Sequence, residues 1–75
     1  MKLYNYSMLQ GKIVERFKTR AAFAHALGIS ERSLSLKFNN HIGWKQSEII
    51  KACDLLGVSD NAIPAYFFVL NVQFN

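Results

Sequence analysis

Cysteine, histidine and carboxylate side chains could support catalysis or bind a metal, and this sequence has few of them: one Cys, two His and five Asp+Glu. Cys53, His25 and His41 fall in separate predicted elements, so no Cys/His pair of the kind used in nucleophilic catalysis is expected. A single cysteine forms no internal disulfide, and with two histidines it cannot supply a four-ligand zinc cluster. The sequence has neither a glycine-rich phosphate loop nor a paired-carboxylate arrangement. It therefore predicts a protein that is not an enzyme and needs no metal, cofactor or small-molecule ligand.

Basic side chains are more informative, because they are unevenly distributed along the chain. Nine Lys+Arg against five Asp+Glu give a formal net charge of +4. Residues 1–45 carry eight bases and two acids, a net charge of +6, whereas residues 46–75 carry one base and three acids, a net charge of −2. A polyanion such as a nucleic acid is therefore expected to bind the first part of the chain.

Length and composition predict one ordinary globular domain over residues 1–75. A chain of 75 residues buries only about 60% of the surface that its unfolded form exposes, which leaves no room for a second domain. The N-terminus lacks the apolar stretch of a signal peptide. The longest apolar run, Ala65–Leu70, is far shorter than the ~20 residues that span a bilayer. We expect a cytoplasmic protein with no membrane association.

Apolar residues recur at helical spacing in short segments, with cap and turn residues between them. Thr19 and Ser30 have the side-chain oxygens of N-caps. Gly28 and Gly57 each follow the last apolar residues of a segment, where helices commonly end in the left-handed conformation. Gly11 costs about 1 kcal/mol relative to Ala inside a helix, which predicts a packing reason for it. The pattern predicts an all-α fold of five helices, over residues 6–17, 20–27, 31–38, 45–56 and 59–67.

The C-terminal segment, residues 68–75, has a different pattern. Its apolar residues alternate with polar ones at period two, as in a half-buried strand. No second strand is predicted, so the segment must pair with another molecule or lie as an extended arm. We therefore expect a dimer interface at the apolar positions Phe68, Leu70, Val72 and Phe74.

The predicted helix over residues 31–38 has an outward face suited to DNA. Leu34 and Phe38 define its inner face, and at about 100° per residue Leu36 falls on the opposite side. Arg32 lies one turn before Leu36, with two serines on the flanks. Arginine can donate two hydrogen bonds to guanine, serine can bond base or phosphate, and an aliphatic side chain can cover a thymine methyl. The alternatives are that Arg32 belongs to a solvated face and that Leu36 is an isolated surface leucine.

The segment from Thr19 to Asn40 resembles the helix-turn-helix of the lambda-repressor/Cro superfamily, also called Xre-type regulators. The motif RAAFAHALGISERSLSLKFN occupies residues 20–39 and has the small, Gly, aliphatic and apolar residues that the family favours at Ala24, Gly28, Ile29 and Leu34. The run W-x-Q-x-E-I from Trp44 and the aromatic cluster Tyr66, Phe67 and Phe68 are similar to small Cro-like regulators of Gram-positive phages and prophages. The resemblance implies a five-helix lambda-repressor-like DNA-binding domain with a short extended C-terminal segment.

The same resemblance implies two sets of DNA contacts. The base-reading positions would be Glu31, Arg32, Ser33, Ser35 and Leu36. The phosphate contacts would be Thr19, Arg20, Ser30, Lys37, Asn39, Asn40 and Lys45. Thr19 and Arg20 stand at a helix start, where free N–H groups attract an anion. Glu31 can accept from cytosine, orient Arg32 or favour the helix start.

Two positions depart from the family pattern. Lys37 stands where many members have an aliphatic residue, so we expect Phe38 to take that packing role and Lys37 to lie on the surface. Lys45 stands where relatives have a Thr or Ser cap, which favours a phosphate contact instead. Trp44 and Cys53 are expected in the core.

Together these features predict a sequence-specific transcriptional regulator, a Cro-type repressor of a phage or prophage. Its third helix would enter the major groove of operator DNA, and the bound protein would occlude polymerase. One such helix covers few base pairs, so we expect a homodimer on two half-sites about 34 Å apart. Two alternatives keep the same fold: a protein that binds and modulates a partner repressor through the apolar tail or the late aromatics, and an antitoxin-type regulator.

Overall fold

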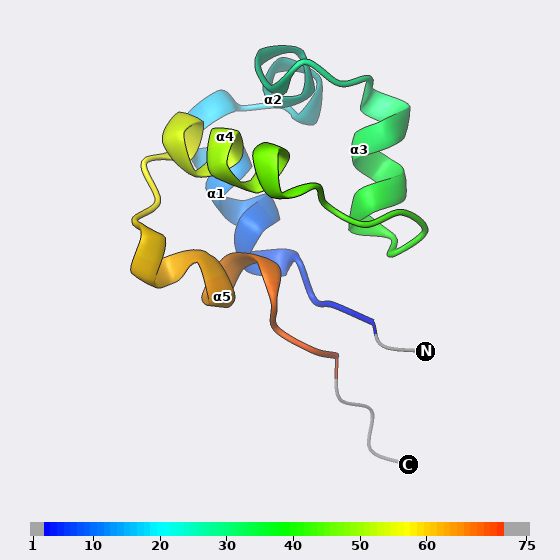
Figure 1. Cartoon of the computed structure of the whole chain (residues 1–75). Helices are drawn as coiled ribbons and strands as arrows, with labels where there is room; N and C mark the ends of the chain where they lie inside the picture. Colours follow the sequence, from blue (N-terminus) through cyan, green and yellow to red (C-terminus); the bar gives the residue numbers. More distant parts are fainter. Residues whose placement is uncertain (1–2, 72–75) are drawn as a thin grey trace.

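The computed structural model of the chain describes residues 3–71. Within them, five α-helices and one 3₁₀ turn follow one another (Figure 1): α1 (Ser7–Phe17), α2 (Arg20–Leu27), α3 (Glu31–Phe38), α4 (Gln46–Leu56), η1 (Asp60–Ala62) and α5 (Ile63–Phe67). α3 stands at one side of the molecule, away from α5 (Figure 1). The predicted all-α fold of five helices is confirmed.

Local capping explains where the helices begin and end. The Thr19 hydroxyl accepts from the Ala22 N–H at 3.1 Å, and the Ser30 hydroxyl accepts from the Ser33 N–H at 3.0 Å. α2 ends at Gly28, whose φ is +86°, and α4 ends at Gly57, whose φ is +67°. Residues other than glycine rarely adopt this left-handed conformation. The caps and stops expected from the sequence are therefore confirmed at these positions.

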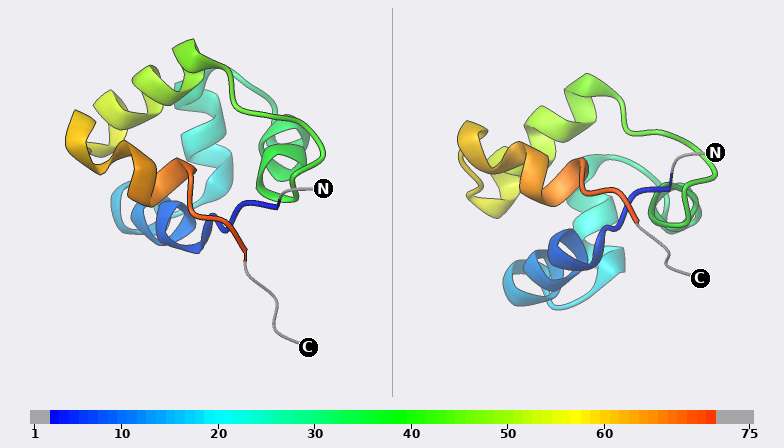
Figure 2. Two further views of the ribbon diagram at one scale, coloured as in Figure 1. Left: turned by 60° about the horizontal axis from the view of Figure 1, so that its bottom comes forward. Right: turned by 90° about the horizontal axis from the view of Figure 1, so that it is seen from below.

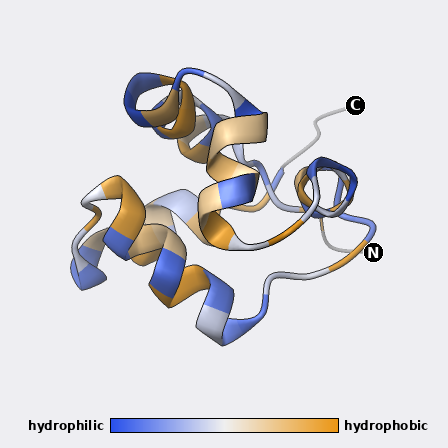
Figure 3. Cartoon of the chain, turned by 90° about the horizontal axis from the view of Figure 1, so that it is seen from above, coloured by the Kyte–Doolittle hydropathy of each residue, from blue (hydrophilic) through white to orange (hydrophobic). Residues whose placement is uncertain are grey.

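The hydrophobic core receives side chains from every α-helix. Each helix carries both hydrophobic and hydrophilic residues along its length, so that it can turn an apolar face inward (Figure 3). Trp44 lies just before α4 and packs edge-on against Phe67, with ring centroids 5.2 Å apart. Trp44 packs against the core and Cys53 is buried, as expected. The largest fully buried side chains are Leu9, Ile13, Phe23, Leu34, Leu56 and Phe67.

Gly11 in α1 has no packing role. The residue is exposed, and a Cβ added there would meet nothing within 4 Å. The expectation of a packing reason is therefore wrong. Gly57 is different, because a Cβ at that position would overlap the guanidinium of Arg16. The Arg16 Nε donates to the Leu56 carbonyl at 3.2 Å and covers the end of α4.

The two ends of the described chain pair with each other. The Asn5 N–H donates to the Val69 carbonyl and the Asn71 N–H donates to the Leu3 carbonyl, both at 2.7 Å, which makes Tyr4 and Leu70 an antiparallel bridge. The chain segments leading to both termini run side by side in both views of Figure 2. The expectation that the tail finds no partner in its own chain is wrong for its described part, because Leu70 forms an isolated antiparallel bridge with Tyr4.

The four apolar tail positions expected at a dimer interface are not all described. Phe68 and Leu70 are exposed, whereas Val72 and Phe74 lie outside the described residues. No helix among residues 3–71 is long and apolar enough to cross a membrane.

Candidate functional site

The structure forms the expected helix-turn-helix from α2 and α3. The N–H groups of Gly28 and Ile29 both donate to the Ala24 carbonyl, at 2.9 and 3.0 Å, which makes the turn between the helices tight. Ala24 is 1% exposed where the helices meet, so a larger side chain there would push them apart.

α3 presents a polar face to solvent, as the sequence predicted. Leu34 and Phe38 point into the core, while Glu31 and Arg32 are exposed in the first turn. Leu36 is half-buried, like Ser33 and Ser35. The Ser30 hydroxyl donates to the Ser33 hydroxyl at 3.1 Å. All five expected base-reading residues therefore come from one short helix, with the two charged ones most accessible.

The start of α2 lies on the exposed surface too. Thr19 and Arg20 are both exposed. The Arg20 guanidinium donates to the Gln10 side-chain oxygen at 2.6 Å and lies 5.0 Å from the centre of the Phe38 ring. These contacts hold the guanidinium between α1 and α3. Ser30, Asn39 and Lys45 are also exposed, so these five of the expected phosphate-binding residues are accessible.

Lys37 is not on the surface. Its side chain is 4% exposed, and its Nζ lies 2.7 Å from the Glu48 Oε1 and donates to the Gly43 carbonyl at 3.0 Å. The ammonium also lies 5.5 Å from the centre of the Trp44 ring. The expectation of a surface Lys37 that contacts phosphate is wrong, because α4 places a carboxylate beside it. Lys37 itself, and not only Phe38, fills the position that is aliphatic in many relatives.

The side-chain amide of Asn40 also forms hydrogen bonds within the molecule. Its Oδ1 accepts from the Tyr4 N–H at 2.7 Å, and its Nδ2 donates to the Tyr4 carbonyl at 3.0 Å. Its φ of +63° is a conformation that asparagine adopts more readily than most residues. Both ends of the amide are therefore used, and the expected phosphate contact from Asn40 is corrected to a contact with the N-terminal segment.

Lys45 precedes α4 without a side-chain cap. Its backbone N–H instead donates to the Glu48 Oε1 at 2.8 Å. Burial alone would raise the pKa of Glu48, but the hydrogen bonds from Lys37 and Lys45 and their positive charges outweigh it, so the pKa is below its usual value. Glu48 thus supplies the N3 half of a capping box, and the Lys45 side chain stays exposed.

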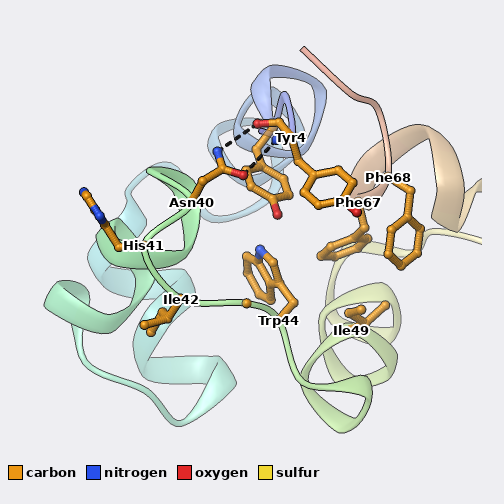
Figure 4. A pocket seen from close by; sticks show the side chains of 10 residues that line it. Tyr4, Asn40, His41, Ile42, Trp44, Ile49, Phe67 and Phe68 are labelled. Atoms are coloured by element: carbon orange, nitrogen blue, oxygen red, sulfur yellow. Dashed lines mark hydrogen bonds between the residues drawn. The ribbon is translucent and has the colours of Figure 1, made fainter. Parts of the chain in front are cut away.

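An aromatic cavity that the sequence does not predict lies beside the loop between α3 and α4. The cavity has a volume of about 280 Å³ and opens to solvent (Figure 4). The N-terminal segment, the α3–α4 loop, α4 and the end of α5 each contribute to its walls. The lining residues are Tyr4, Tyr6, Asn40, His41, Ile42, Gly43, Trp44, Ile49, Phe67 and Phe68. No local signal could have predicted it, because its walls are separated by tens of residues in sequence.

Exposed apolar side chains adjoin this cavity. Phe68, Val69 and Leu70 are 51%, 42% and 45% exposed, and Ile42 on the opposite wall is 42% exposed. We call residues Phe68–Leu70 the apolar edge. Large apolar residues exposed next to a hollow are typical of a protein-binding site.

The remaining chemically capable residues do not form a site. Cys53 is buried, and burial together with Asp60 and Asp54 raises the pKa of its thiol, which makes it a poor nucleophile. Among residues 3–71, no group of three or more His, Cys, Asp or Glu side chains could hold a metal ion.

The five helices and the exposed α2–turn–α3 unit define a small all-α helix-turn-helix domain. The chain belongs to the family described as "Protein of unknown function (DUF739)", whose model matches residues 2–69. It is also similar to the modulator of repression (MOR) of the temperate bacteriophage TP901-1 from Lactococcus lactis, known from a solution structure. The two share 49% sequence identity, with 87% of this chain and 88% of that chain covered and a TM-score of 0.77. None of the curated proteins compared with the chain matches it.

Proposed function

We propose that this protein is a phage or prophage regulator that acts by binding a partner repressor and modulating it. The observation that carries the proposal is its 49% identity with a phage modulator of repression along almost the whole of both chains. This similarity favours the modulator over the Cro-type repressor, which was the first expectation from the sequence.

The surface of the molecule supports a protein partner. The apolar edge has three consecutive large apolar residues that are between 42% and 51% exposed, and the first of them, Phe68, lines the aromatic cavity. Removing such surface from water favours association by about 25 cal/mol for each Å² buried. Lys37 and Asn40 are meanwhile engaged inside the molecule, which leaves a smaller set of DNA contacts than the sequence predicted.

The direct experiment uses the repressor encoded in the same phage or prophage genome. Titration calorimetry of the two purified proteins should show a complex of defined stoichiometry. Mobility-shift assays should then show that this protein changes the affinity of the repressor for its operator. The proposal would be contradicted if no complex formed at about 100 μM protein, roughly 100 times a Kd of 1 μM.

A second candidate function is sequence-specific DNA binding by α3. The exposed Glu31 and Arg32 at its start favour it, together with the accessible Thr19 and Arg20 at the start of α2. In this case the protein would be a homodimer on operator half-sites about 34 Å apart. An antitoxin-type regulator would share this DNA-binding surface.

A mobility-shift assay without repressor separates the two functions. A protein that reads DNA should shift its operator in preference to random duplex at physiological salt. A modulator should change the mobility of operator DNA only when the repressor is present. Binding to random duplex alone at low salt would reflect only the net positive charge.

A further inference from the structure

The backbone of Tyr4 is paired on both sides. On one side, its neighbours Leu3 and Asn5 exchange hydrogen bonds with Asn71 and Val69. On the other side, the N–H and C=O of Tyr4 itself bond to the side-chain amide of Asn40, at 2.7 and 3.0 Å. The Asn40 amide therefore takes the place that a further strand would occupy.

The backbone of Leu70 is paired on one side only. Tyr4 and Leu70 form the kind of antiparallel pair in which the residues' own N–H and C=O groups point away from each other. No described residue bonds to the N–H or C=O of Leu70. An exposed strand edge of this kind is a template for another extended chain.

The cavity lies next to this open edge. Phe68 lines the cavity and is two residues before Leu70, while Tyr4 lines it and faces Leu70 across the bridge. The Phe68 ring packs edge-on against the Tyr4 ring, with centroids 6.2 Å apart, so these two lining side chains lie together. Figure 4 shows Tyr4, Phe67 and Phe68 gathered on one side of the cavity, with Trp44 below them.

The chemistry of the cavity is apolar with few polar groups. The Trp44 Nε1 is buried and has no hydrogen-bond partner among residues 3–71. Burial and the neighbouring Tyr4 raise the pKa of the Tyr6 hydroxyl, which stays protonated. The volume of about 280 Å³ exceeds the roughly 150 Å³ that holds a benzene ring and falls below the usual range for drug-sized ligands. One large apolar side chain matches this space.

We infer that an extended segment of the partner protein adds as a strand to the open edge at Leu70 and places one large apolar side chain in the aromatic cavity. Main-chain hydrogen bonds would give part of the affinity, and the cavity would select the side chain, as in other complexes formed by strand addition. The inference rests on the proposed function, because it takes the repressor as the partner.

A short segment fits this surface better than a second copy of the same chain. The described segment that takes part in the bridge, residues 69–71, is three residues long, or about 10 Å of strand. Two copies that met only along this edge would bury far less than the roughly 800 Å² per partner of a stable interface.

Two variants at one position separate backbone pairing from side-chain contact. Leu70→Pro removes the outward N–H but leaves both bridge bonds, which involve only Val69 and Asn71 on this strand. Leu70→Ala keeps the N–H and shortens the side chain. Repressor binding should weaken about tenfold with proline relative to alanine, the effect of about one lost hydrogen bond. Thermal unfolding of both variants, and hydrogen exchange of the Asn5 amide, show whether the bridge is intact.

Nuclear magnetic resonance locates the segment. The protein is labelled with ¹⁵N and titrated with unlabelled repressor, so that only this chain is observed. The Trp44 indole and Leu70 amide resonances should shift together, and the Leu70 amide should become protected from exchange.

Each outcome has a separate meaning. A complex in which these two resonances do not move, or in which proline and alanine bind alike, overturns the inference and leaves the proposed function standing. Absence of any complex refutes the proposed function and the inference with it. A homodimer in sedimentation that Leu70→Pro converts to a monomer would show that a second copy occupies the edge, which also overturns the inference.

Discussion

The Nζ of Lys37 lies 2.7 Å from the Oε1 of Glu48, and this pair connects α3 to the first turn of α4. The same carboxylate accepts from the backbone N–H of Lys45, and the same ammonium donates to the Gly43 carbonyl. One ion pair therefore fixes both ends of the loop between α3 and α4, including Trp44 and one wall of the aromatic cavity.

Removal of Lys37 should destabilise the protein strongly. Lys37→Ala leaves the largely buried carboxylate of Glu48 without its partner, and such changes cost about 3–5 kcal/mol. Lys51→Ala, at an exposed position on α4, is the matched control and should change stability by less than about 0.5 kcal/mol. Urea unfolding followed by the fluorescence of the single tryptophan measures both. Equal stability of the two variants would show that the pair contributes nothing.

The Glu48 carboxylate should make stability depend on acid pH. Its pKa in the folded protein is lower than the ordinary value of 4.5. The stabilisation is therefore present above the unfolded pKa and is lost as the pH falls through the folded pKa. Between about pH 6 and about pH 3, the free energy of unfolding should fall less in Glu48→Gln than in the original protein. Parallel curves for the two proteins would contradict the assignment.

Two glycines should respond to alanine in opposite ways. Gly57→Ala places a side chain at a φ of +67° and against Arg16, and it should destabilise by at least about 1–2 kcal/mol. Gly11→Ala fills open space in an exposed part of α1 and should stabilise by about 0.5–1 kcal/mol. Denaturant midpoints of the two variants test the pair. A destabilised Gly11→Ala would reveal a constraint on α1 that the structure does not show.

DNA binding, if it accompanies modulation, should depend on α3 and on Lys45 in different ways. Arg32→Ala should cost roughly 1–3 kcal/mol on the operator and relax specificity at one base pair. Lys45→Ala should weaken all sequences alike and reduce the salt dependence of binding. Affinities on operator and random duplex at several salt concentrations distinguish the two effects. Identical behaviour of both variants on both DNAs would exclude readout by the first turn of α3.

The sequence alone predicts the helices and most of their ends, although residues 60–62 form a 3₁₀ turn and α5 begins only at Ile63. The hydroxyls of Thr19 and Ser30 and the glycines at 28 and 57 act on backbone groups only a few residues away, so their effect can be predicted locally. The resemblance to Xre-type regulators predicted the helix-turn-helix fold. The sequence also left open an alternative function, the modulation of a partner repressor. The outward position of Arg32 followed from helical periodicity alone.

Tertiary structure decided which polar residues are free to act. Lys37 meets Glu48 only because α4 packs beside the end of α3, and Asn40 meets Tyr4 across 36 residues of sequence. The bridge between Tyr4 and Leu70 likewise joins opposite ends of the chain, and it places the open edge beside the aromatic cavity. Periodicity gives the direction of a side chain from its own helix but not the chemistry of what packs against it. That chemistry depends on residues distant in sequence, so the buried lysine, the occupied asparagine and the cavity became visible only in the folded molecule.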